Sequence, residues 1–292
     1  MARASPEVQL HLLPLTHLTI SLGRRISLLE DTILRCNSDF LLQFFSTWSI
    51  QSIISLGKVN KRLHQVVKLY STMMWNVSAF LGHYFSDLNE LKRLLSEERF
   101  VLFGPAVFSF FDRRTFQFWP LDICICVNSM DNFIRLLQIE GYIYVDGPPG
   151  IPSFETAVLG ELIRTPYIKL KSNGERNSSE SDRSAWGPYV FSKDEIQELR
   201  IRVYVVRCDA YRHVLSLRAT GLMNLITFKH AVSLFPRSTF MHKRSFVSQQ
   251  EDTPLYFPLH NEHFWLEHNK KVFNVETIGL THEPFEDVEM GK

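Results

Sequence analysis

The chain has 292 residues, enough for one large domain or two modest ones. Hydrophobic residues make up 45% of it, which supplies ample side chains for a buried core. Lys and Arg total 32 against 31 for Asp and Glu, a formal net charge of +1. This balance argues against a dedicated nucleic-acid-binding protein, which usually carries a basic excess, and against an acidic disordered chain.

The N-terminal stretch and the cysteines do not point to any chemistry, but they indicate the cellular compartment of the protein. Residues 1–37 show no strong periodicity and are expected to form an irregular lead-in segment. No apolar run approaches the roughly 20 residues that cross a bilayer, so no membrane association is expected. The cysteines match neither a disulfide framework nor a metal-ligand spacing, which predicts an intracellular protein, cytoplasmic or nuclear. They are Cys36, Cys124, Cys126 and Cys208.

Apolar residues recur at helical spacing from Phe40 onward and predict a compact module of three short helices over residues 38–80. Ser49 is the expected N-cap of the second helix, and Gly57 its expected end. The third helix is expected to end near Trp75. We therefore expect a small helical unit before any larger domain.

This stretch, DFLLQFFSTWSIQSIISLGKVNKRLHQVVKLYSTMMW, resembles an F-box. The resemblance implies docking to the adaptor of a cullin-type ubiquitin ligase, and a role in bringing an unknown substrate protein to that ligase. F-boxes usually open with a Leu-Pro pair before the first helix, whereas residues 36–39 of this chain read Cys-Asn-Ser-Asp. Ser38 or Asp39 is expected to cap the helix instead.

A unit this small holds more apolar surface than it can bury alone, and an apolar patch left outside is a binding site for a partner. The alternative is that the same stripe packs on the rest of the chain. If the docking interpretation holds, Leu63→Asp unfolds the unit and Phe44→Asp abolishes docking only. The candidate docking residues are Leu41, Phe44, Phe45, Ile50, Ile53 and Leu56.

From residue 95 to residue 247, strand and helix patterns alternate, which predicts an α+β fold for the chain as a whole. The polar, Ser-rich stretch 171–188 is expected to be a mobile insertion. Residues 210–236 are expected to form helical stretches broken near Gly221. Residues 248–292 are expected to be a C-terminal extension.

The middle of the chain resembles a nucleotidyltransferase-like domain of mixed sheet and helices. The residues that carry this resemblance are Gly104 with the following VFSFFDR, the stretch WPLDICICV, and the block ATGLMNLITFKHAVSLFPRSTF. More narrowly, the chain resembles a group of F-box-like proteins from mushroom-forming fungi, over roughly residues 40–245. The expected architecture is a helical F-box-like unit followed by this domain.

Active nucleotidyltransferases use a Gly-Ser turn for the triphosphate and three strand-borne carboxylates for divalent metals. Two of these acids alternate along one strand, so both face the same ions. Here Pro105 replaces the serine, Pro120 the first acid and Arg202 the third. Gly104 and Asp122 remain as a degenerate nucleotide site, and Asp122 is expected to cap a turn or pair with a nearby Arg. We expect an inactive domain, with no catalytic residue, metal or cofactor.

Two other functions stay open at this point. One is a divergent metal-dependent nucleotidyltransferase, in which Asp112 assists Asp122. The other is a protein that binds single-stranded nucleic acid through a basic late region with interleaved aromatic residues. Charge runs usually lie on solvated helix faces, which makes the nucleic-acid interpretation the weaker one. The aromatic residues concerned are Phe228, Phe235, Phe240 and Phe246; His260 and His263 lack a zinc-ligand spacing.

Overall fold

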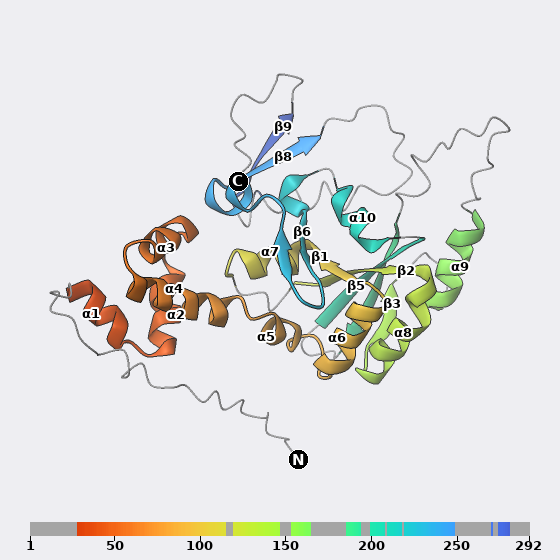
Figure 1. The fold of residues 1–292 in the computed structure, drawn as a ribbon. Coiled ribbons are helices and arrows are strands. Elements are labelled where there is room, and N and C mark those ends of the chain that lie inside the picture. The colour runs from red at the N-terminus through yellow and green to blue at the C-terminus, as the bar shows by residue number, and fades with distance from the viewer. Residues whose placement is uncertain are drawn as a thin grey trace, which may run out of the picture. The chain divides into compact units, whose positions relative to one another are not determined.

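The chain divides into two compact units, Met1–Met74 and Trp75–Lys292, in a computed structural model (Figure 1). The predicted α+β class is confirmed, because the described residues form helices and a seven-stranded mixed sheet. None of the described helices is long and apolar enough to cross a membrane. The structure describes residues 28–114, 119–146, 153–164, 185–193, 199–207, 209–217, 219–248, 270 and 274–280.

Four helices form the first unit: α1 (Leu28–Arg35), α2 (Ser38–Ser46), α3 (Ile50–Gly57) and α4 (Lys61–Met74). Their apolar faces meet in one core that includes Ile33 of α1, Leu63 of α4 and Tyr70 of α4. The prediction of an irregular lead-in is therefore wrong for residues 28–35, which are helical and buried through Ile33. Residues 1–27 lie outside the described residues.

The ends of the short helices follow from capping side chains. Ser49 Oγ accepts the N–H of Ser52 at 3.0 Å, and α3 ends at Gly57, both as predicted. The cap of α2 is Asn37, whose Oδ1 accepts the N–H of Phe40 at 2.8 Å. Ser38 and the residue after it are already helical, so the expectation of a cap at Ser38 or Asp39 is wrong by one or two positions.

The boundary of the helical module lies before residue 80. Helix α5 (Val77–Leu81) belongs to the second unit, where Phe80 is buried in the main core. The indole N–H of Trp75 donates to the carbonyl of Phe111 at 3.3 Å, which also places it in that unit. Residues 75–80 thus belong to the larger unit and not to the module predicted over residues 38–80.

The second unit is built on a sheet with the strand order β3-β4-β5-β2-β1-β6-β7. Strands β2 and β5 are parallel, and the other described pairs in this sheet are antiparallel. The strands are β1 (Val101–Phe103), β2 (Leu121–Cys126), β3 (Ile143–Asp146), β4 (Trp186–Lys193), β5 (Leu199–Val206), β6 (Asn224–Ile226) and β7 (Ala231–Ser233).

Helices cover the two faces of this sheet unequally (Figure 1). One face packs through Leu121, Ile123 and Val203 against α6 (Leu88–Glu97), α7 (Gly104–Phe111), α8 (Met130–Ile139) and α9 (Phe154–Arg164). The other face packs through Cys124, Val206 and Leu225 against the short α10 (Ala210–Leu215). Alternation along β2 therefore places Asp122 on the less covered face, together with Cys124 and Cys126.

Two expectations about the second half of the chain need correction. Residues 185–188, predicted to end the mobile insertion, open with buried Ala185 and Trp186 at the start of β4, while 171–184 lie outside the described residues. Of residues 210–236, α10 and the short turn Thr220–Leu222 are helical, but residues 224–233 form the β6–β7 hairpin, because cross-strand pairing overrides local helical spacing. The C-terminal extension contributes β9 (Glu276–Leu280), which pairs with β8 (Arg244–Ser248).

A buried carboxylate ties α6, α8 and β4 together. Glu140, directly after α8, accepts the N–H groups of Ser86 at 2.9 Å and Asp87 at 2.8 Å, and the ammonium of Lys193 on β4 at 3.1 Å. Burial by itself raises the pKa of this carboxyl, but these hydrogen bonds outweigh burial and hold the pKa below its ordinary value of 4.5.

Glu140→Gln should lower the free energy of unfolding by about 1–3 kcal/mol at neutral pH, because charge-assisted hydrogen bonds to buried donors are lost. A depressed folded pKa contributes stability that is complete above the unfolded value and declines as the pH falls toward the folded value. Urea unfolding of both proteins from about pH 7 to about pH 3 should therefore show their difference shrinking below pH 4.5. A difference that does not change with pH would contradict this role.

Candidate functional site

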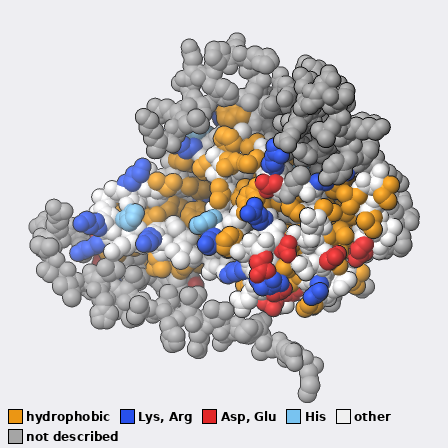
Figure 2. Space-filling model, turned by 45° about the vertical axis from the view of Figure 1, so that its right-hand side comes forward, with side chains coloured by type: hydrophobic (Ala, Val, Ile, Leu, Met, Phe, Trp, Pro, Cys, Tyr) orange, Lys and Arg blue, Asp and Glu red, His pale blue; other side chains and the backbone are white. Residues whose placement is uncertain are grey.

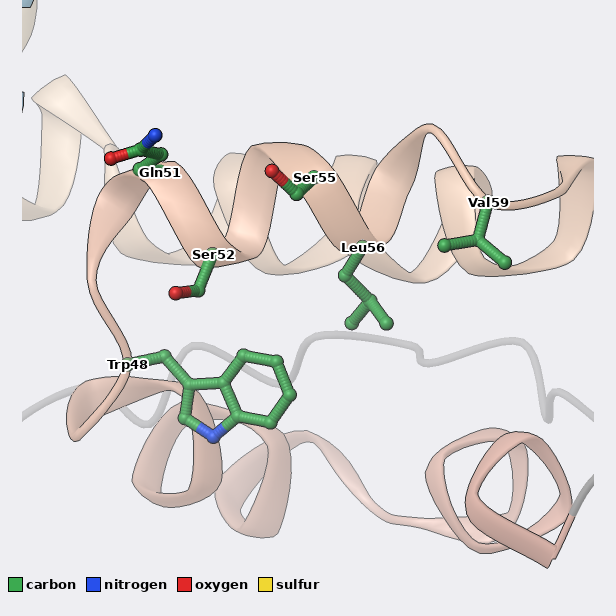
Figure 3. Close-up of a pocket in the computed structure, with 6 residues that line it drawn as sticks. All are labelled: Trp48, Gln51, Ser52, Ser55, Leu56 and Val59. Carbon is green, nitrogen blue, oxygen red and sulfur yellow. The ribbon is translucent and has the colours of Figure 1, made fainter.

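The first unit carries a shallow groove of about 460 Å³ beside α3 (Figure 3). Figure 3 shows the Trp48 indole on one side, with Ser52 and Leu56 pointing from α3 toward it. Val59, in the turn after α3, closes one end and is 67% exposed. The groove thus combines apolar surface with hydroxyl and amide groups, of which the Ser52 hydroxyl is bonded to that of Ser49 at 2.8 Å. Its lining residues are Trp48, Gln51, Ser52, Ser55, Leu56 and Val59.

Only some of the predicted docking residues are near this surface. Leu41, Phe45 and Ile53 are at most 2% exposed and form the core of the unit itself, so their assignment to a partner-facing surface is wrong. The physical reason is that α1 and α4 supply enough apolar surface to cover them. Of the other candidates, Leu56 lines the groove, and Phe44 and Ile50 are half-buried.

Phe40, Trp48 and Val59 were not among the predicted docking residues. Phe40 is 45% exposed and its ring stacks on Phe44 at 5.7 Å between centroids. Phe44 in turn contacts Trp48 at 5.2 Å, so the exposed aromatic side of α2 continues to the groove. Val59 follows Gly57 in a turn, where helical periodicity no longer predicts which side chains are buried. The signal that would have found them is a large apolar residue at a helix end.

In the second unit, the fold brings Gly104, Asp122 and Arg202 together as one cluster. Gly104 opens α7 directly after β1, and Asp122 lies on β2 opposite Phe103 of β1. Strand β5 runs parallel to β2 in a register that sets Arg202 beside Asp122. Gly104, Asp122 and Arg202 are therefore neighbours in space.

Asp122 forms a two-point ion pair with Arg202. Oδ1 accepts from Arg202 Nε at 2.5 Å, and Oδ2 accepts from Arg202 Nη2 at 2.6 Å. The Asp122 side chain is 1% exposed and that of Arg202 13% exposed. Burial raises the pKa of the Asp122 carboxyl, and the Arg202 guanidinium opposes that rise. The predicted pairing of Asp122 with a nearby arginine is confirmed.

The close approach of Asp122 explains why position 104 is glycine. Gly104 has a φ of +77°, a conformation that side chains disfavour. A Cβ at this position would lie 2.1 Å from Oδ2 of Asp122. The Asp122 carboxylate thus lies beside Gly104 at the N-terminal end of α7, where the helix dipole favours an anion. The chain fills this anion position with its own side chain and neutralises it with Arg202.

No described group of three or more His, Cys, Asp or Glu side chains is arranged to hold a metal ion. Asp112 does not assist Asp122, because it follows the opposite end of α7 and pairs there with Arg114 and Lys243. His260 and His263 lie outside the described residues. A two-metal mechanism requires carboxylates that share the same ions. The arrangement around Asp122 offers one carboxylate, and that carboxylate is already paired.

The aromatic residues considered for nucleic-acid stacking do not form one platform. Phe240 is buried against the rings of Phe108 and Phe111, at 5.1 and 5.7 Å between centroids. Phe228 and Phe235 are 37% and 38% exposed. Stacking with successive bases requires exposed rings in sequence along a groove. The described structure therefore offers two exposed rings of the four that the composition suggested.

In comparisons with protein-family models, with curated proteins and with solved structures, nothing matches this chain.

Proposed function

We propose that the protein is a non-catalytic interaction protein, in which the first unit docks the adaptor of a cullin-type ubiquitin ligase and the second unit presents a surface to a substrate protein. The observation that supports this most directly is the paired, buried state of Asp122 beside Gly104. A site that is filled by its own ion pair binds neither metal nor triphosphate without breaking that pair. Binding of a substrate protein is then the role with the most support for the second unit.

The groove beside α3 supports the docking half of the proposal. Its apolar floor is contributed by Trp48, Leu56 and Val59, and its rim by the polar side chains of α3. An exposed apolar surface with a polar rim is typical of a protein-binding site. The partner should insert an apolar side chain beside the Trp48 indole, because buried aromatic contacts dominate such interfaces.

A pull-down with the purified adaptor should test this half of the proposal. Val59→Asp should weaken binding by at least about tenfold, because it places an unpaired charge in an apolar contact. Phe44→Asp is a poorer probe, since the Phe44 ring also contacts buried Phe45 and the change would disturb the core. The matched control is Ile54→Asp, which alters an exposed residue of α3 that does not line the groove.

Equal binding by the Val59 and Ile54 variants would show that the groove is not the docking surface. Failure of the unsubstituted protein to bind any adaptor of its source organism would overturn the ubiquitin-ligase role. The fold of each variant is checked by hydrogen exchange over α3 and α4, so that lost binding is not confused with unfolding.

A further inference from the structure

The β6–β7 hairpin of the second unit ends in a rigid two-residue tip. Thr227 N–H donates to the carbonyl of His230 at 2.8 Å, and the Thr227 hydroxyl accepts the N–H of His230 at 3.1 Å. These bonds fix Phe228 and Lys229 at the turn, where both are exposed. The Lys229 ammonium lies 5.0 Å from the centroid of the Phe228 ring. A cation and an aromatic ring are thus held together at the tip.

Strand β7 is an edge of the sheet among the described strands, because β6 is its one neighbour there. His230 and Leu234 bond toward β6, through Thr227 N–H to His230 O and through Leu234 N–H to Met223 O at 3.2 Å. Antiparallel ladders alternate, so the backbone groups of Ala231 and Ser233 point away from β6. This edge can accept a further strand.

Apolar side chains accompany the free edge. Val232 is opposite buried Leu225 in the register, yet it is 37% exposed. Leu234 and Phe235 are 40% and 38% exposed. Residues 234–237 are exposed one after another. An edge with exposed aliphatic side chains is the pattern that strand-adding partners use, since backbone bonds and side-chain contacts are made together.

The stretch of chain that contains this edge is positively charged. Between Asp209 and Glu251 the chain contains no Asp or Glu. Two cations of this stretch have acidic neighbours from other elements, Lys243 with Asp112 and Arg244 with Glu276 at 4.0 Å.

Two exposed cations remain available beside the edge. Lys229 precedes β7 and Arg237 follows it, and neither has an ion pair within the part of the chain that the structure describes. In the view of Figure 2, acidic side chains gather toward the lower edge of the described surface, and hydrophobic side chains mix with Lys and Arg above them. A ligand at β7 therefore meets apolar surface with a positive charge at each end.

We propose that the free edge of β7 binds an extended segment of a partner protein that has an apolar centre and acidic residues at both ends. The segment adds as a strand along Ala231–Ser233, its apolar side chains contact Val232 and Leu234, and its carboxylates pair with Lys229 and Arg237. The edge of β7 is then the surface through which the second unit holds its substrate protein. Only the description of the bound segment as part of a substrate rests on the function proposed above.

Nucleic acid and membranes fit the same surface less well. The exposed side chains between the two cations are aliphatic as well as aromatic, and aliphatic side chains do not stack on bases. A membrane leaves the outward backbone groups of Ala231 and Ser233 without hydrogen-bond partners. A strand of a partner protein satisfies both the backbone groups and the charges.

Fluorescence anisotropy with the full chain tests the proposal. The probe is a labelled peptide, Glu-Glu-Val-Thr-Val-Thr-Val-Glu-Glu, and its matched control replaces each Glu by Lys. The acidic peptide should bind, and the basic one should not. Lys229→Glu combined with Arg237→Glu should weaken binding by about tenfold or more, since two ion contacts are reversed. Lys61→Glu combined with Lys68→Glu, a matched reversal at exposed positions of α4, should change nothing.

Ala231→Pro separates strand addition from simple charge attraction. It removes one outward N–H at an edge position that tolerates proline, and it should weaken peptide binding while leaving both cations in place. Equal affinity for the acidic and basic peptides, or no effect of Ala231→Pro, would overturn strand addition. Binding of an oligothymidylate or of phosphatidylserine vesicles that exceeds peptide binding and requires Lys229 and Arg237 would also overturn it. None of these results bears on the groove beside α3, whose test uses different residues and a different partner.

Discussion

Asp122→Asn should lower the free energy of unfolding of the second unit by about 3–5 kcal/mol. The substitution keeps the shape of the side chain but removes its charge, so the largely buried Arg202 guanidinium loses the carboxylate that accepts two of its hydrogen bonds. Arginine does not lose its proton in proteins, so the guanidinium stays charged after the substitution. Urea unfolding at neutral pH, with hydrogen exchange over β2 and β5 to locate the change, measures this effect.

Arg202→Met is the complementary variant, and its cost should depend on pH. The unpaired Asp122 carboxyl is then buried with a raised pKa, so it takes up a proton more readily in the folded than in the unfolded state. The folded state is favoured below the raised pKa, and this variant should therefore recover stability as the pH falls.

The double variant Asp122→Asn with Arg202→Met should be more stable than the sum of the two losses implies, because neither charge remains. Additive losses, or a loss below about 1 kcal/mol for Asp122→Asn, would show that the pair is not a buried, mutually dependent unit.

The same variants also test the remaining enzymatic interpretation. A divergent nucleotidyltransferase would bind Mg²⁺–ATP in a way that depends on Asp122, and calorimetry measures this directly. We expect no such binding by the unsubstituted protein, because Arg202 holds both carboxylate oxygens at 2.5 and 2.6 Å. Tight binding that disappears in Asp122→Asn would overturn the non-catalytic proposal.

Leu63→Asp should unfold the first unit while the second unit stays folded. Leu63 is 5% exposed and lies in the core between the four helices. Losing its packing alone costs about 2–5 kcal/mol, and burying an unpaired carboxylate adds to this. A helical unit of this size has only a few kcal/mol of stability to lose. Hydrogen exchange in the full chain should show fast exchange throughout α2, α3 and α4, with β2 and β5 unchanged.

The matched control for this variant is Ile54→Asp, which introduces the same charge at a residue that is 43% exposed. It should leave the exchange of α2 and α4 as in the unsubstituted protein, since surface substitutions usually change stability by less than about 0.5 kcal/mol. Simultaneous unfolding of both units by Leu63→Asp would contradict the division of the chain at residue 74.

Features that depend on a few neighbouring residues were predictable from the sequence. The Ser49 cap and the end of α3 at Gly57 follow from local hydrogen bonding and local periodicity. The alternation of β2, which sets Cys124 and Cys126 on one face, follows from the geometry of a single strand. The pairing of Asp122 with an arginine was also expected, because a buried carboxylate needs a partner.

Features that depend on distant segments were not predictable in the same way. Helix α1 was not expected, although its apolar side chains also gather on one face, and its place in the first unit is recognised because Ile33 enters the shared core. Leu41 and Phe45 belong to the same core, and this changes the function assigned to them. The β6–β7 hairpin has a sequence that suggests helix, and pairing with β1 and within the hairpin decides otherwise.

By itself, the sequence determined that the chain is α+β and that helices precede the sheet. It also shows that Pro120 and Arg202 stand where the proposed nucleotidyltransferase resemblance would place two acids. These are matters of residue identity and short-range spacing. The tertiary structure decided that Gly104, Asp122 and Arg202 close on one another, and that the apolar surface left outside the first unit is at Trp48 and Val59. Strand register and helix packing bring residues together across many positions in the chain, and local spacing carries no information about which of them meet.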